Sequence, residues 1–229
     1  MSFTQELAAH TQELRQQIHA MPFNRALADG SLTPEIFQGY IIQDAHYLEG
    51  FARALSLAAS KAPDAQSIAQ LAGSAAGAIA VERELHAHYM GLFGVTSDDF
   101  EGTDVSAACD HYVSFLLRSA AIGDFPEAVT ALLPCFWIYR DIGMEIAQTS
   151  RADNPYSAWI ATYSGEAFDQ SVQRMLDLVN KVADDASDVT RARMHHAFQR
   201  SCWHEWRFWD SAYHREGWKQ PRPQDAVTG

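Results

Sequence analysis

Apolar residues recur at intervals of three and four positions along most of this 229-residue sequence, and no segment alternates apolar and polar residues as a strand would. In residues 34–61, for example, Phe37, Tyr40, Ile41 and Leu48 fall on one face of a helix. A chain of this length can bury a complete hydrophobic core, and nothing in the sequence requires a second one. The sequence therefore predicts an all-α helical bundle folded as a single domain.

Capping residues and prolines divide this pattern into separate helices. Ser2 opens the first helix with a capping box, and Thr33 caps the second, which has Pro34 at its first position. Similar signals predict helices over residues 2–21, 34–61, 64–90, 103–123, from 124 to a turn at 154–155, around 159, over 165–183 and over 189–213. We expect a helical domain at residues 1–214 and, because residues 215–229 have no period and two prolines, a C-terminal surface tail.

Charge and cysteine content exclude several classes of function. The formal net charge is −12, and the 17 basic residues are scattered, which argues against binding of nucleic acid or of an anionic membrane. No signal-peptide pattern opens the sequence, and no window approaches about 18 consecutive apolar residues. Cys109, Cys135 and Cys202 are too few and too far apart for a disulfide framework or a CxxC zinc site. We expect a cytoplasmic protein with reduced thiols.

Four predicted helices each carry a functional side chain on the face that should be buried. Asp44 and Glu205 interrupt the apolar stripes of the second and the last helix, while Tyr112 and Cys135 lie on the inward faces of two others. A buried carboxylate without partners costs on the order of several kcal/mol, so two of them indicate compensating hydrogen bonds or a shared cavity. Taken singly, each residue also has a structural explanation, because cysteines and tyrosines commonly pack and a carboxylate can anchor a hydrogen-bond network. The combination favours a ligand cavity.

Two pairs of potential metal ligands compete with this interpretation. Glu82 and His86, and likewise Asp210 and His214, are spaced i, i+4, as on bundle helices that hold a di-iron site. The first pair lies among charges typical of a solvated face, and His214 begins the predicted tail. We therefore expect no metal, with a di-iron oxidase as an alternative.

Five segments carry a resemblance to the TenA, or thiaminase II, family of aminopyrimidine hydrolases. They span nearly the whole chain and read, in order, HAMPFNRALADGSL, FQGYIIQDAHYLEGFARAL, LLPCFWIYRDIG, NPYSAWIATYSGEAF and WHEWRFWDSAY. The resemblance implies the haem oxygenase-like all-α fold and a homotetramer. It also places the chain in the cysteine-bearing branch of the family, because Cys135 stands where that branch has its nucleophile.

The resemblance implies a role for each inward-facing residue. In that family a cysteine nucleophile and a glutamate are catalytic, an aspartate recognises the pyrimidine, two aromatic rings sandwich it, and two tyrosines surround the nucleophile. The matching positions are, in that order, Cys135, Glu205, Asp44, Tyr47 and Tyr139, and Tyr112 and Tyr163. A thiolate and a carboxylate suffice for the reaction, so no metal and no organic cofactor are expected.

The implied reaction is the hydrolysis of 4-amino-5-aminomethyl-2-methylpyrimidine, or of thiamin, to 4-amino-5-hydroxymethyl-2-methylpyrimidine in thiamin salvage. The partner is then a small aminopyrimidine or thiamin. Besides the di-iron oxidase, one alternative stays open: a protein that binds a pyrimidine or thiamin without turning it over. Cys135 is the residue that favours turnover over binding alone.

Overall fold

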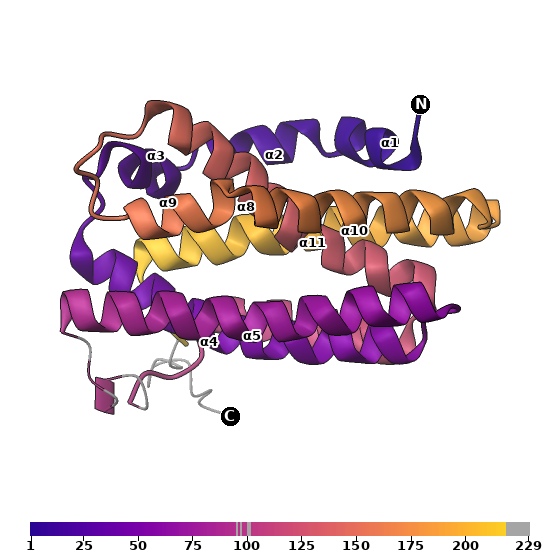
Figure 1. Cartoon of the computed structure of the whole chain (residues 1–229), viewed down its shortest axis with the longest axis horizontal. Coiled ribbons are helices and arrows are strands. Elements are labelled where there is room, and N and C mark those ends of the chain that lie inside the picture. The colour runs from indigo at the N-terminus through magenta and orange to yellow at the C-terminus, as the bar shows by residue number, and fades with distance from the viewer. Residues whose placement is uncertain (95, 97, 100–101, 219–229) are drawn as a thin grey trace, which may run out of the picture.

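The structure is a computed structural model that describes residues 1–94, 96, 98–99 and 102–218, apart from the side chains of residues 81, 82 and 86 (Figure 1). Within these ranges it is built of helices and contains no strand, which confirms the predicted all-α class. The helices are α1 (Phe3–His10), α2 (Gln12–His19), α3 (Pro22–Asp29), α4 (Pro34–Ser60), α5 (Ala65–Phe93), α7 (Ala107–Ile122), α8 (Phe125–Thr149), α9 (Ser157–Ser164), α10 (Glu166–Asp184) and α11 (Asp188–His214). No helix in the described ranges combines the length and apolar character that a bilayer crossing needs.

Most helix starts follow the predicted capping signals, but α3 was not predicted, and the first and the fourth predicted helices differ from the structure. The first predicted helix is divided at Thr11, whose hydroxyl donates to the Leu7 carbonyl and whose backbone leaves the helical region. The fourth begins at Ala107 rather than after Thr103, because the Ser106 side chain accepts from a first-turn N–H and caps it. Of the predicted tail, residues 219–229 lie outside the described part of the chain.

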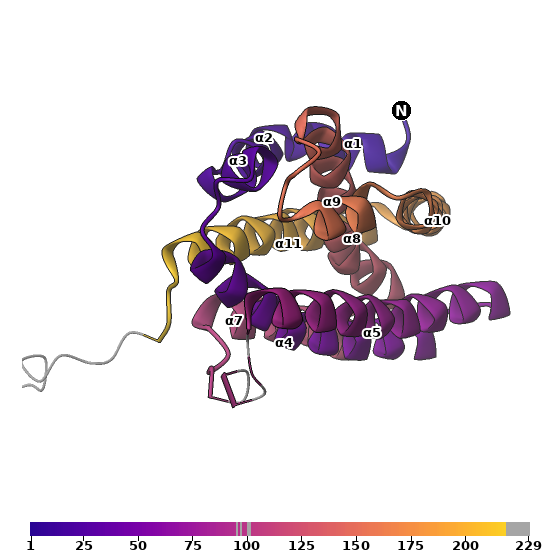
Figure 2. The ribbon, with the colours of Figure 1, turned by 60° about the vertical axis from the view of Figure 1, so that its left-hand side comes forward.

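Two helices organise the bundle. α4 packs against α5, α7, α8 and α11, while α8 crosses the molecule diagonally and contacts α4, α7, α9, α10 and α11 (Figure 1). The short helices α1 to α3 lie on the side opposite α4 and α5, with α11 between them (Figure 2). Any group that α4, α8 and α11 aim inward therefore meets the others at the centre of the bundle.

Two glycines let helices approach closely beside this centre. A Cβ at Gly50 would lie 2.4 Å from Val113 Cγ1, so α4 and α7 could not keep their spacing with a larger residue there. A Cβ at Gly143 would lie 2.7 Å from the Tyr163 backbone, at the contact between α8 and α9. The second contact matters for the site because it brings the Tyr163 ring to 4.9 Å from that of Tyr139.

Candidate active site

A cavity of about 380 Å³ opens between α4, α5, α8, α9 and α10. Five of the residues that the sequence singled out line it: Asp44, Tyr47, Cys135, Tyr139 and Tyr163. Each is almost fully buried, although the five come from only three helices of the bundle. Helical spacing puts Asp44 and Tyr47 one turn apart on α4, and Cys135 and Tyr139 one turn apart on α8.

The other two predicted site residues lie against the wall of this cavity rather than in it. The ring of Tyr112 is 4.9 Å from that of Tyr47, and its hydroxyl donates to Glu205 Oε1 at 2.7 Å. Glu205 is 1% exposed, and burial raises the pKa of its carboxyl from the ordinary 4.5 to about 8. The negative charge of Asp44 raises it further, while the Tyr112 hydrogen bond opposes both. Glu205 thus exchanges a proton close to neutral pH.

The Cys135 thiol is deprotonated less easily than an ordinary cysteine. Burial raises its pKa well above the usual range, and the carboxylates of Glu205 and Asp44 raise it further. The opposing influence is the Tyr47 hydroxyl, which favours the thiolate and lowers the pKa. The resting thiol is therefore protonated, and a nucleophilic thiolate requires a neighbouring proton acceptor.

The two tyrosines that the resemblance places around the nucleophile, Tyr112 and Tyr163, both interact electrostatically with the Cys135 thiol. The Tyr112 hydroxyl makes its hydrogen bonds with Glu205 and Ser201, not with the thiol. Tyr163 lines the cavity, but Tyr47, expected only to stack on the ring, is the tyrosine whose hydroxyl acts on Cys135. Sequence spacing could not distinguish these hydroxyls, because they come from three different helices.

The aromatic wall around Tyr139 is held from behind. The ring centroid of Tyr139 lies 5.0 Å from that of Trp209, and its hydroxyl accepts a hydrogen bond from Tyr40 at 3.4 Å. Tyr40 in turn accepts from the Trp159 indole N–H at 3.2 Å. Because these supporting side chains are buried, the face that Tyr139 presents to the cavity is fixed before a ligand arrives.

Other lining residues were not predicted. Phe51 and Phe136, with ring centroids 5.4 Å apart, add an apolar wall. The mouth is formed partly by small residues of α5 and by α10, whose exposed Arg174 lines the cavity. The only sequence signal for the α5 wall is the spacing of its small residues, Gly73 and Ser74 followed one turn later by Gly77 and Ala78. Small side chains leave room there for a ligand to pass.

Cys109, Cys202, Asp210 and His214 do not line the cavity. Cys109 and Cys202 are fully buried, and burial raises the pKa of both thiols, that of Cys109 to about 12. His214 Nδ1 lies 3.3 Å from Asp210 Oδ1, but within the described residues no three His, Cys, Asp or Glu side chains are grouped to hold a metal ion. The side chains of Glu82 and His86 lie outside the description.

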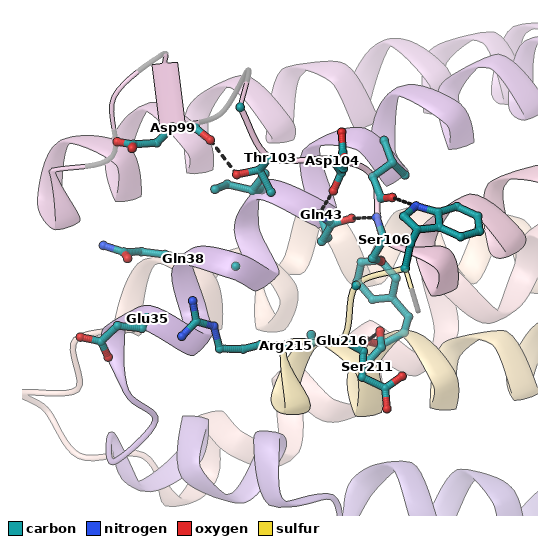
Figure 3. A pocket seen from close by; sticks show the side chains of 18 of the residues that line it. Glu35, Gln38, Gln43, Asp99, Thr103, Asp104, Ser106, Ser211, Arg215 and Glu216 are labelled. Carbon is teal, nitrogen blue, oxygen red and sulfur yellow. Dashed lines mark hydrogen bonds between the residues drawn. The ribbon is translucent and has the colours of Figure 1, made fainter. Parts of the chain in front are cut away.

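A second hollow, of about 720 Å³, lies between the start of α4, the segment before α7 and the end of α11 (Figure 3). Its polar groups bond to one another: the Gln43 amide donates to the Asp104 carbonyl at 3.0 Å and accepts from the Ser106 N–H at 2.7 Å. The Trp218 indole N–H donates to the Val105 carbonyl at 2.8 Å. This hollow, called the outer hollow below, contains none of the predicted site residues.

The sequence and the fold are both similar to those of known proteins. Residues 8–215 match the TENA/THI-4/PQQC family. The chain is 31% identical over 218 residues to the aminopyrimidine aminohydrolase of Bacillus subtilis (strain 168), covering 95% of this chain and 92% of that one. It is 34% identical over 216 residues to the thiamine biosynthesis multifunctional protein ThiED of Corynebacterium efficiens, covering 94% of this chain but 29% of that protein. The solved TenA homologue protein from P. horikoshii OT3 has a TM-score of 0.84 and 28% identity, covering 93% of this chain and 99% of that chain.

Proposed function

Because the chain belongs to the TENA/THI-4/PQQC family, we propose that it is a hydrolase of aminopyrimidines that uses Cys135 as its nucleophile. Its substrate is a 4-amino-2-methylpyrimidine that carries a leaving group on an exocyclic methylene, either ammonia or the thiazole of thiamin, and its place is thiamin salvage. The family likeness seen in the sequence is confirmed by these comparisons. The observation that carries the cysteine's role is that Cys135 and Asp44 line one cavity with Glu205 against its wall.

Binding of the ring uses the apolar cavity and one buried charge. Tyr47 and Tyr139 supply the flat walls, and stacking on such rings contributes about 0.5 to 1.5 kcal/mol per pair beyond burial. Asp44, 1% exposed, accepts hydrogen bonds from the ring and its amino group. This interaction makes the ring more electrophilic, so the same contact that selects an aminopyrimidine also prepares it for attack.

Covalent catalysis begins with removal of the thiol proton. The Glu205 carboxylate accepts this proton, and the Cys135 thiolate adds to the ring carbon beside the one that bears the methylene. Expulsion of the leaving group follows, with the proton of Glu205 passing to the departing amine. Water then adds at the methylene and gives a proton to Glu205, the thiolate leaves the ring, and Glu205 returns the proton to Cys135. A carboxyl pKa of about 8 suits a group that must give and take protons near neutral pH.

The cavity is larger than the ring alone requires. Its volume of about 380 Å³ exceeds what a single substituted pyrimidine fills, which leaves room for a leaving group beside the ring. The exposed Arg174 guanidinium lines the same cavity and repels both a thiazolium and a protonated aminomethyl group, so its charge does not by itself select between the two substrates.

The protein acts in the cytoplasm as a homotetramer in this proposal. The formal net charge of −12 is compatible with that location. Trp203, 38% exposed on α11, offers an apolar surface for subunit contact. Sedimentation analysis tests the assembly, and a monomer at micromolar concentration would contradict it.

The decisive experiment measures ammonia and hydroxymethylpyrimidine released from 4-amino-5-aminomethyl-2-methylpyrimidine, beside thiamin, by wild type and Cys135→Ser. We expect turnover by the wild type and a loss of roughly 10³-fold or more in the variant, because the serine hydroxyl is a far weaker nucleophile. Cys109→Ser is the matched control, since Cys109 is equally buried but packs outside the cavity. Tight ligand binding without wild-type turnover would instead identify a binding protein.

A further inference from the structure

Ser201 of α11 lies close to the Glu205 carboxyl, to which it is linked through the Tyr112 hydroxyl. It is fully buried, one helical turn before Glu205. Its Oγ is 2.9 Å from the Tyr112 hydroxyl and donates to the Ala131 carbonyl at 2.7 Å. Together with the Tyr112 contact to Glu205, these form one continuous chain of hydrogen bonds from the carboxyl to the backbone of α8.

Counting protons along this chain distinguishes two states of Glu205. Three oxygen–oxygen links join Glu205, Tyr112, Ser201 and the Ala131 carbonyl. When Glu205 is protonated, each of the three hydroxyl groups donates once, to the next oxygen along, and every link is a hydrogen bond. When Glu205 is ionised, Tyr112 must donate back to the carboxylate, so the two remaining hydrogens serve three links. The protonated state therefore has one more hydrogen bond.

We propose that Ser201 is a positioning residue that stabilises the protonated form of Glu205 in the steps of turnover in which Glu205 carries a proton, by accepting the Tyr112 hydrogen and donating its own to the Ala131 carbonyl. This rests on the proposed role of Glu205 as the proton shuttle. Ser201 touches neither the cavity nor Cys135 directly, so it acts through Tyr112. The Ala131 carbonyl lies one turn before Cys135, so the same chain also fixes α11 against the helix that carries the nucleophile.

Other groups around Glu205 do not provide this function. The titratable side chains that interact with it electrostatically are Cys202 on its own helix and, on four other helices, Tyr40, Asp44, Tyr47, Tyr112, Cys135, Tyr139 and Tyr163. His204 stacks on Tyr112 at 5.2 Å, but burial lowers its pKa to about 3, so it stays neutral. The Tyr47 hydroxyl also interacts with the Tyr112 hydroxyl. Ser201 differs from it because the Ser201 hydroxyl in turn donates to a backbone carbonyl, that of Ala131, and so continues the chain to α8.

The test titrates Glu205 directly in Ser201→Ala, by the carboxylic acid band in infrared difference spectra against Glu205→Gln. Loss of one neutral hydrogen bond from the protonated state should lower the pKa of Glu205 by about 0.5 to 1 unit. The acidic limb of the pH profile of kcat/KM should move to lower pH by the same amount, with about 3- to 10-fold more of the ionised form at low pH. Ser201→Thr keeps the hydroxyl and should restore the wild-type titration.

Ser211→Ala is the matched control, because Ser211 is also buried on α11 but donates to the Phe208 carbonyl of its own helix and faces the outer hollow. An unchanged or raised pKa of Glu205 in Ser201→Ala, in protein whose circular dichroism and melting show a native fold, would overturn the proposal. The infrared titration needs no substrate. If Ser201→Ala shows the shift relative to the wild type, but the wild type turns over no aminopyrimidine, the proposed function would be refuted and the role of Ser201 would stand.

Discussion

The outer hollow and the buried cavity differ in a way that size does not reveal. The hollow is the larger, at about 720 Å³ against about 380 Å³, yet its groups bond to neighbouring backbone, as Gln43 and Trp218 do. The smaller cavity contains Asp44 and Cys135, with Glu205 against its wall, and the pKa values of the thiol and of Glu205 are raised by burial. Buried ionisable groups with shifted pKa values, rather than the larger volume, therefore identify the cavity as the candidate active site.

The comparison also separates two ways of satisfying polar groups. In the outer hollow, the Thr103 hydroxyl donates to the Asp99 carbonyl at 2.6 Å, four residues away, and such local bonds hold a chain segment in place (Figure 3). Beside the buried cavity, Tyr112 and Glu205 are 93 positions apart in sequence. Their hydrogen bond exists only because the bundle brings α7 and α11 together. A long-range pair such as Tyr112 and Glu205 changes the proton affinity of the carboxyl, whereas the local bond between Thr103 and Asp99 stabilises the conformation of a loop.

Glu205→Gln should give the largest effect that follows from this comparison. The glutamine cannot shuttle protons, so turnover should fall roughly 10²- to 10⁴-fold while aminopyrimidine binding changes little. Kinetics and equilibrium binding of the substrate measure the two quantities separately. A variant that turns over at the wild-type rate would remove Glu205 from the mechanism.

The same variant should be more stable than the wild type at alkaline pH. The pKa of Glu205 is about 8 when folded and near 4.5 when unfolded, so the folded protein retains a proton that the unfolded chain releases between these values. Wild-type stability attributable to Glu205 therefore falls as pH rises from about 4.5 to about 8, by on the order of 4 kcal/mol. Denaturant unfolding of both proteins at pH 5 and at pH 8 measures this; a difference that does not grow with pH would contradict the buried, raised-pKa carboxyl.

Tyr47→Phe should have an intermediate effect and distinguish hydroxyl from ring. Removing the hydroxyl that favours the Cys135 thiolate should lower kcat/KM roughly 10-fold or more, because hydrogen bonds to charged groups contribute about 1.5 to 3 kcal/mol. The phenyl ring still stacks, so ligand affinity should stay close to that of the wild type. Tyr47→Ala supplies the contrast, since it should also weaken binding, by about 3- to 10-fold. Equal binding by both variants would count against stacking at this position.

Trp218→Ala should have the smallest effect and is the sharpest test of the contrast between the two regions. It removes the indole that donates to the Val105 carbonyl in the outer hollow. We expect turnover and affinity within about twofold of the wild type, because surface substitutions away from a site change free energies by about 0.5 kcal/mol or less. A loss of activity comparable to that of Tyr47→Phe would show that the outer hollow takes part in the function.

Several features of this protein were determined by the sequence alone. The period of its apolar residues predicts an all-α chain, and the capping signals at Ser2 and Thr33 predict where helices begin, because helix formation depends on local side-chain and backbone geometry. Asp44 and Glu205 could be picked out as candidates because a carboxylate on an apolar stripe conflicts with burial. Cys135 was singled out by family resemblance, since its position on such a stripe also fits simple packing.

Only the tertiary structure decided which of these groups touch. Nothing in the spacing of the chain assigns the Tyr112 hydroxyl to Glu205, and Ser201 looks in sequence like any small residue on a buried stripe. The α5 wall of the cavity carries no functional residue type, so its small side chains become meaningful only when α10 is placed across from them. Helix formation is local, whereas hydrogen-bond partners and pKa values depend on distances between helices, and those distances are set by how the whole core packs.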